Sequence, residues 1–250
     1  MSLKQQIRNH QSILGTFVKT THYHNTEVLA RTSLDVICLD AEHAPFTRQD
    51  LDQCVLAAKA NNKPVVVRVP DTNPATILNA LDIGSDGVVL PHIKSAAQAK
   101  SIVKTCFYGP GGRGFAGSTR FAEYTTAGIV KTLAKNVDET CVIAQIEDLE
   151  ALDEIDDICQ IEEIDCIFVG RIDLTISLGQ TNPSHENVIA AVETIVSTCQ
   201  KHKKPCGMFV GNLNEIPRWK NLGVSVFLLA SDHNFLLSGA EALRQSFDNL

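Results

Sequence analysis

Residues 36–69 read VICLDAEHAPFTRQDLDQCVLAAKANNKPVVVRV, and this stretch contains one complete unit of the fold. VICLD (36–40) and VVVRV (65–69) are near-continuous apolar runs rich in β-branched residues, which is typical of strands buried on both faces. Between them, residues 50–61 carry apolar side chains at helical spacing. A buried strand, a helix and a second buried strand indicate a parallel sheet covered by helices.

The same alternation runs along the whole chain. Further strands are predicted at 13–18, 87–91, 141–147, 164–170, 206–210 and 224–230, and further helices at 74–84, 95–106, 148–159 and 184–202. Eight strand–helix units in 250 residues predict one domain over residues 1–250, an α/β fold of the closed (β/α)8 TIM barrel type. The alternative is an open doubly wound sheet, which usually has a glycine-rich first turn, whereas KTTHYHN (19–25) follows the first strand here.

Composition argues against several classes of partner. The chain has 22 basic and 29 acidic residues and no basic block, so we expect no nucleic acid and no membrane as partners. It has no apolar signal segment and no apolar run near the roughly 20 residues that span a bilayer, which predicts a soluble, cytoplasmic protein. The eight cysteines form no C-x-x-C pair, and several lie in apolar runs, so buried free thiols are expected rather than disulfides or a zinc site.

Polar residues gather where the predicted strands end. In a (β/α)8 barrel the carboxyl ends of all strands face one pocket. The residues that would meet there are Asp40, Glu42, His43, Arg68, His92, Gln145, Glu147, Arg171 and Asp173. This set contains acids, an arginine and imidazoles, which are the groups that bind metal ions and anions and that transfer protons.

Three of these features have a chemical interpretation, and two of them also have a structural alternative. Glu147 and Asp173 together supply two hard oxygen ligands for Mg²⁺ or Mn²⁺, although singly they suit a helix first turn and a loop cap. Arg68 lies in an apolar strand and needs an anion, for which a substrate carboxylate is a natural choice. His43 is either a general base beside two acids or an ordinary loop histidine.

Six segments in order then resemble a known family. LDAEHAPF (39–46), VVRVP (66–70), ALDIGSDGVVLP (80–91), RGFAGSTRFAEY (113–124), AQIED (144–148) and FVGRIDLTISLG (168–179) resemble the HpcH/HpaI family of metal-dependent (class II) pyruvate aldolases. This family includes 2-dehydro-3-deoxyglucarate aldolase and 4-hydroxy-2-oxoheptanedioate aldolase. The resemblance implies a carbon–carbon lyase that reversibly cleaves a 4-hydroxy-2-oxo acid to pyruvate and an aldehyde through a metal-stabilised pyruvate enolate.

The resemblance also implies a role for each matching residue. Glu147 and Asp173 would hold a divalent metal ion (Mg²⁺, Mn²⁺ or Co²⁺), Arg68 would bind the pyruvate carboxylate, and His43 would be the acid/base, oriented by Asp82. Gln145, Gly170 and Asp40 would line the substrate pocket. The family fold is a TIM barrel of the phosphoenolpyruvate/pyruvate-binding type. It is usually a homo-oligomer, here a trimer or hexamer, whose C-terminal helix is exchanged between protomers.

Departures and alternatives remain open at this point. Lys94 and Arg171 replace residues common in the family, and Arg171 would reach either the acceptor aldehyde or a surface salt bridge. The tail DHNFLLSGAEALRQSFDNL (232–250) predicts an amphipathic helix that covers either its own barrel or a partner's. Competing functions are an acyl-CoA lyase of the malyl-CoA/citramalyl-CoA type, an enzyme like phosphoenolpyruvate mutase or isocitrate lyase, and a non-catalytic 2-oxo-acid-binding barrel. A Schiff-base aldolase would need a lysine inside a strand, and the predicted strands contain none.

Overall fold

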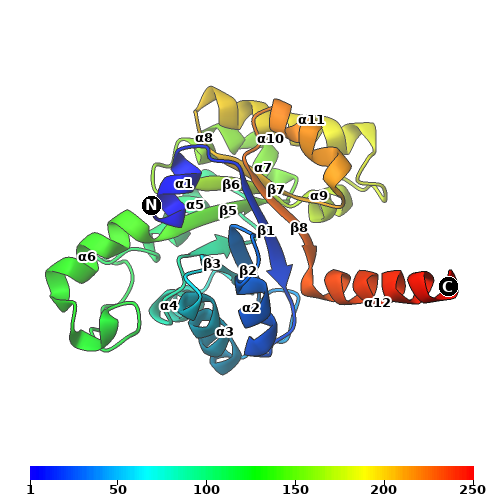
Figure 1. Ribbon diagram of the computed structural model, residues 1–250. Helices are drawn as coiled ribbons and strands as arrows, with labels where there is room; N and C mark the ends of the chain where they lie inside the picture. The colour runs from blue at the N-terminus through cyan, green and yellow to red at the C-terminus, as the bar shows by residue number, and fades with distance from the viewer.

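The computed structural model describes residues 1–250 and forms a closed barrel of parallel strands in sequence order, with β8 pairing β1 (Figure 1). This confirms the predicted (β/α)8 barrel and excludes the open sheet. The strands are β1 (Ile13–Val18), β2 (Val36–Asp40), β3 (Val65–Arg68), β4 (Gly87–Leu90), β5 (Cys141–Ile146), β6 (Cys166–Val169), β7 (Cys206–Val210) and β8 (Val226–Ser231).

Alternate strand residues point into the barrel, where they supply most of a cluster of 14 buried apolar residues that includes Phe17, Cys38 and Val66. The first helix, α1 (Leu3–Arg8), contributes Leu3 and Ile7 to this same cluster. Because α1 directly precedes β1, it closes the amino end of the barrel, the end at which the strands begin. The carboxyl end, at which the strands stop, is therefore the open one.

Helices surround the strands, and their apolar faces form with the outward strand residues a second cluster of 47 buried residues. After α1, the helices are α2 (Tyr23–Ala30), α3 (Arg48–Ala60), α4 (Pro74–Asp82), α5 (Ala96–Lys104), α6 (Gly128–Glu139), α7 (Glu150–Asp153), α8 (Ile155–Cys159), α9 (Arg171–Ser177), α10 (Glu186–Lys201), α11 (Ile216–Asn221) and α12 (Asp232–Asp248), with 3-10 turns η1 (Glu123–Thr125) and η2 (Leu213–Glu215). The predicted helix 148–159 is in fact two short helices, because Glu154 leaves the helical conformation between them. All eight cysteines are buried and free, as expected.

The last helix does not cover its own barrel. Figure 1 shows α12 projecting away from the other elements, and its apolar residues are exposed, with Leu236 65%, Leu243 73% and Phe247 63% accessible. The alternative in which the tail covers its own barrel is therefore wrong, whereas its exchange with a partner stays a prediction. None of the helices combines the length and apolar character required to cross a bilayer.

Candidate active site

Strand alternation places three polar side chains inside the carboxyl end of the barrel. Asp40 follows the inward-facing Cys38 by two residues, Arg68 follows Val66 by two, and the same spacing from Ile143 gives Gln145. Asp40 and Arg68 are directly opposite each other in the β2–β3 register. The uppermost layer of the barrel interior is therefore polar, whereas the layers beneath it are apolar.

Arg68 is the positive centre of this layer. It is 7% exposed, and its Nη2 lies 2.8 Å from Oδ1 of Asp40 while its Nη1 lies 3.3 Å from Oε2 of Glu42. The guanidinium stacks over the Phe17 ring at 4.6 Å from the centroid. Burial disfavours the charge, but Asp40 and Glu42 outweigh it and raise the pKa of Arg68. Two acids thus hold the arginine at the floor of the site, as a fixed cation.

Asp40 is shared between Arg68 and a lysine that sequence reasoning missed. Lys19 directly follows β1, and its Nζ lies 2.9 Å from Oδ2 of Asp40. Burial opposes ionisation of Asp40, but Arg68 and Lys19 together hold the pKa of this carboxyl below its usual range. The sequence argument against a Schiff-base lysine covered only the interiors of the strands. Lys19 lies just outside them, one residue beyond Val18.

Glu147 is almost fully buried beyond the end of β5, at 1% exposure. Its Oε2 accepts a hydrogen bond from Nε2 of Gln145 at 2.5 Å, and its Oε1 accepts one from the backbone N–H of His92 at 2.9 Å. Burial is the dominant influence and raises the pKa of Glu147, against these two hydrogen bonds. A side chain at position 170 would begin 2.5 Å from Oε2 of Glu147, so glycine is required for the carboxylate to lie here.

His43 lies in the loop after β2 with half of its side chain exposed. Its backbone N–H donates to Oδ1 of Asp40 at 3.2 Å, and its Nε2 lies 3.8 Å from Oε2 of Glu42. The predicted orienting acid is not there. Asp82 ends α4, which returns the chain to the amino end of the barrel, and it pairs with Arg113 at 2.5 Å. Within one chain the predicted His43–Asp82 contact is wrong, and the acid beside His43 is Glu42.

Asp173 is half-buried in the first turn of α9, directly after β6. Its charge contributes to the raised pKa of Glu42, for which burial is the main cause, with Arg68 opposing. Two residues earlier, Arg171 pairs through Nη1 with Oε2 of Glu215 at 2.5 Å. Arg171 is only 8% exposed and its buried Nε has no partner. The salt bridge expected at the surface is therefore a buried one.

A cluster of two acids and one imidazole at this end can hold a divalent metal ion. The potential ligand atoms of Glu42, His92 and Glu147 all lie within 4.8 Å of one another. His92 stood among the strand-end residues without a role, and only its conformation in the structure gives it one. Two acceptor atoms nearby, Oε2 of Glu42 and Oε1 of Gln145, are buried without a hydrogen-bond partner. Unsatisfied acceptors beside several carboxylates are what a cation would satisfy.

The carboxyl end of the barrel contains a cavity of about 360 Å³. Of the predicted site residues, His43, Arg68, Gln145, Gly170 and Asp173 line it. Asp40 and Glu147 lie directly behind that lining, bonded to Lys19 and Gln145 respectively. The cavity has room for a small carboxylic acid beside Arg68, and its other walls are formed in part by Phe168, Phe209 and the start of α12.

The sequence model of the HpcH/HpaI aldolase/citrate lyase family matches residues 13–235. The chain belongs to this family. Over 246 residues it is 31% identical to the 5-keto-4-deoxy-D-glucarate aldolase of Klebsiella pneumoniae, covering 98% of this chain and 95% of that protein. Over 248 residues it is 30% identical to the 4-hydroxy-2-oxo-heptane-1,7-dioate aldolase of Shigella boydii, covering 98% and 94%.

A solved structure of the HpcH/HpaI family supports the same assignment. The family protein from Burkholderia cenocepacia superposes with a TM-score of 0.93 at 27% identity, and the match covers 98% of both chains. The two curated relatives are aldolases and match this HpcH/HpaI chain almost end to end. Membership therefore favours an aldolase over the acyl-CoA lyases and the silent barrel considered from sequence.

Proposed function

We propose that this protein is a divalent-metal-dependent aldolase that reversibly cleaves a 4-hydroxy-2-oxo acid into pyruvate and an aldehyde. The observation that carries the proposal is the convergence of a buried arginine, an imidazole and several carboxylates on one cavity. Arg68, His43 and Asp173 line this cavity together, with Glu147 directly behind it. A non-catalytic binding protein would need the arginine but has no use for the rest of this set.

The chain's own residues account for the binding of the pyruvate half. The Arg68 guanidinium is a fixed cation at the cavity floor, positioned to hold the substrate carboxylate, which it binds more strongly in a site that excludes water. Gln145 lies beside it and keeps one unsatisfied acceptor. Arg171 also lines the cavity, and we assign its guanidinium to a contact with the acceptor aldehyde or its distal carboxylate.

The proton steps fall to His43. In the cleavage direction, its imidazole takes the proton from the C4 hydroxyl, the C3–C4 bond breaks, and the electron pair of that bond forms the enolate between C2 and C3. The aldehyde leaves, and protonation at C3 then completes pyruvate. Glu42 lies 3.8 Å from Nε2 of His43 and is the acid placed to stabilise the charged imidazole. General acid–base catalysis of this kind contributes typically about 10²–10⁴-fold.

The residues present fit a divalent cation. Carboxylates outnumber permanent cations around the cavity, since Asp40, Glu42, Glu147 and Asp173 face Arg68, Lys19 and Arg171, and Arg171 already pairs with a further acid, Glu215. We assign Glu147 and Asp173 as ligands for Mg²⁺, Mn²⁺ or Co²⁺. When bound, the ion supplies positive charge that stabilises the enolate.

One experiment tests enolate formation without requiring the aldehyde. Pyruvate is incubated with the protein in deuterium oxide, and loss of the methyl proton signal is followed by NMR. We expect exchange with Mg²⁺, Mn²⁺ or Co²⁺, none after EDTA, and recovery when metal is restored. Lys19 is the one lysine that lines the cavity, so it is the residue that a Schiff-base mechanism would use. Trapping of pyruvate on Lys19 by borohydride, with exchange unaffected by EDTA, would contradict the proposal.

We also propose that the protein is a cytoplasmic homo-oligomer. Eight buried free thiols favour a reducing compartment. The exposed apolar face of α12 favours packing on another subunit. Light scattering of the full chain should report a species larger than 27.2 kDa, and removal of residues 233–250 should yield monomer or aggregate. A monodisperse full-length monomer at micromolar concentration would contradict this part.

A further inference from the structure

His92 has a backbone conformation that is uncommon for a residue with a side chain. It directly follows Pro91 at the end of β4 with φ of 53°, in the left-handed region. In this conformation its backbone N–H donates to Oε1 of Glu147 at 2.9 Å. The same residue thus bonds the buried carboxylate through its main chain and turns its imidazole toward the acids of the cavity.

The two ring nitrogens of His92 have different neighbours. Nδ1 lies 3.0 Å from Oδ2 of Asp148, and Lys94 holds the other oxygen of that carboxylate at 3.1 Å. Nδ1 also lies 3.5 Å from Oε1 of Glu147, while Nε2 faces Glu42, 3.6 Å from its Oε1. A hydrogen bond from Nδ1–H to Asp148 selects the tautomer whose Nε2 carries a lone pair. Histidine ligands of metal ions usually have this arrangement, in which one nitrogen donates to a carboxylate and the other binds the ion.

The spacing of the neighbouring oxygens suits a shared ion. Nitrogen and oxygen ligands lie about 2.0–2.2 Å from a first-row ion, so atoms around the same ion are separated by at most about 4.4 Å. The ligand atoms of Glu42, His92 and Glu147 lie within 4.8 Å of one another. A contraction of a few tenths of an ångström would therefore bring all three into contact with one cation.

We infer that His92 supplies a nitrogen ligand, through Nε2, to the divalent ion at Glu147, and that this ligand shifts the metal preference of the protein from Mg²⁺ toward Co²⁺. The inference rests on the proposed function, which requires an ion at Glu147 but leaves its identity open. Mg²⁺ prefers oxygen ligands throughout, whereas an imidazole favours the later first-row ions, and affinity rises from Mn²⁺ to Co²⁺ in the usual series.

The test reads the ligand directly and does not depend on turnover. Metal-free full-length protein is loaded with Mn²⁺ alone, and pulsed electron paramagnetic resonance detects nitrogen-14 coupled to the ion. The variant is His92→Asn, because asparagine tolerates positive φ and keeps the backbone N–H but has no imidazole. His43→Asn is the matched control, since it removes the other imidazole beside Glu42. His92→Gly serves as a second variant if the asparagine disturbs folding.

We expect nitrogen coupling in the wild type and in His43→Asn, and none in His92→Asn or His92→Gly. Calorimetric titration should show Co²⁺ binding about tenfold or more weaker in His92→Asn, with Mg²⁺ binding changed less than about threefold. Mn²⁺ binding without nitrogen coupling, or coupling lost only in His43→Asn, would overturn the inference and leave the proposed function intact. Failure of the wild type to bind any of the three ions would overturn both.

Discussion

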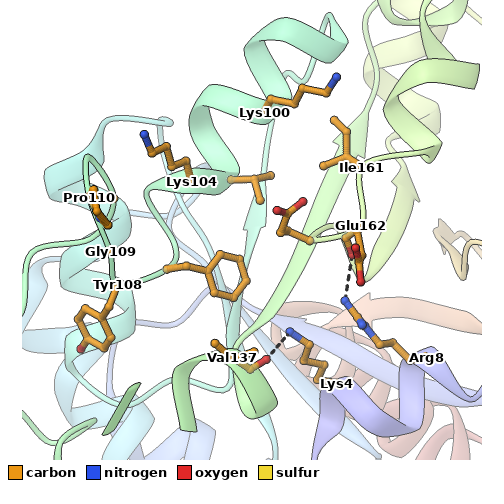
Figure 2. A pocket seen from close by; sticks show the side chains of 14 residues that line it. Lys4, Arg8, Lys100, Lys104, Tyr108, Gly109, Pro110, Val137, Ile161 and Glu162 are labelled. Carbon is orange, nitrogen blue, oxygen red and sulfur yellow. Dashed lines mark hydrogen bonds between the residues drawn. The ribbon is translucent and has the colours of Figure 1, made fainter. Parts of the chain in front are cut away.

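The two ends of the barrel each have a cavity lined by charged residues, but the charges serve different purposes. The cavity at the amino end is the larger, at about 700 Å³ against about 360 Å³. Figure 2 shows Lys4 and Arg8 on its floor, with Lys100 and Lys104 on α5 and Glu162 on the opposite side. Lys4 donates to the carbonyls of Val137 and Thr140 at 2.8 and 3.1 Å.

The carboxyl end has a different charge balance. There the acids outnumber the cations, and Oε2 of Glu42 and Oε1 of Gln145 have no hydrogen-bond partner. At the amino end the one buried lining atom left without a hydrogen-bond partner is the hydroxyl oxygen of Tyr108. The larger cavity is therefore at the amino end, whereas the excess of carboxylates and the unbonded acceptor oxygens are at the carboxyl end. From this comparison we predict that charges at the amino end contribute to stability and that those at the carboxyl end contribute to the proposed catalysis.

The strongest test of this division is Glu147→Gln. We expect kcat/KM to fall about a thousandfold, ~4 kcal/mol, because a neutral amide does not replace a charged metal ligand. In EDTA the free energy of unfolding should not fall. Burial raises the pKa of Glu147, so its ionised form costs stability that is regained as the pH drops through that raised pKa, and glutamine removes this cost. Urea unfolding at pH 7 checks this, and a large loss of stability would contradict it.

Asp40→Asn should have the next largest effect, here on the free energy of unfolding. Asp40 both stabilises the buried Arg68 and positions it in the proposed active site. We expect unfolding at pH 7 to become easier by about 3 kcal/mol, since the buried Arg68 loses its nearest counter-charge. The pKa of Asp40 is lowered, so its contribution is complete above the unfolded value of about 3.9 and disappears as the pH falls through the lower folded value. The difference between variant and wild type should therefore narrow in acid. A difference that widens in acid would overturn this account.

Arg68→Lys tests whether Arg68 binds the substrate carboxylate, while a positive charge is kept at position 68. A lysine retains attraction for Asp40 but cannot bind a carboxylate with two parallel hydrogen bonds. We expect kcat/KM for pyruvate-forming cleavage to fall about 30-fold, ~2 kcal/mol, with the unfolding midpoint little changed. Unchanged kinetics in a folded variant would remove Arg68 from its assigned role.

Much of this architecture could be predicted from sequence because strands, and the face on which each strand residue lies, follow from short stretches of sequence. Apolar runs of strand length identify the eight strands, and period-two alternation then places Asp40, Arg68 and Gln145 inside the barrel. The placement of Asp82 could have been predicted by the same reasoning. It lies in the last turn of a predicted helix, and such a helix returns the chain to the amino end.

Other features depend on conformations that sequence patterns do not specify. The left-handed backbone of His92 decides where its imidazole points, and histidine does not require that region. The interruption between α7 and α8 has no proline or glycine to mark it. Sequence could place Arg171 two residues before Asp173, but its pairing with Glu215 joins the start of α9 to η2, 44 residues further along the chain.

A pair of matched lysine substitutions compares the two ends directly. Lys4→Met removes a buried donor from two carbonyls, so we expect about 1.5 kcal/mol less stability and kcat/KM within twofold of the wild type. Lys19→Met should instead reduce kcat/KM more than it reduces stability. It leaves Asp40 paired with Arg68 alone, which weakens the attraction of that arginine for substrate, and about tenfold in kcat/KM is expected. Equal kinetic losses in both variants would break the division between the ends.

The smallest effect is expected where the amino-end cavity most resembles a binding site. Lys100 and Lys104 lie one turn apart on α5, exposed to solvent, and face the cavity shown in Figure 2. Exposed lysines that hold no buried partner contribute little to folding, so Lys100→Ala combined with Lys104→Ala should change stability by less than about 0.5 kcal/mol. The kinetics should also match the wild type, because both side chains lie at the end opposite Arg68 and Glu147. Steady-state assays with pyruvate and a carboxylated aldehyde, run at two salt concentrations, provide the measurement. A several-fold change in KM that disappears at high salt would instead show that the larger cavity influences the site through its charge.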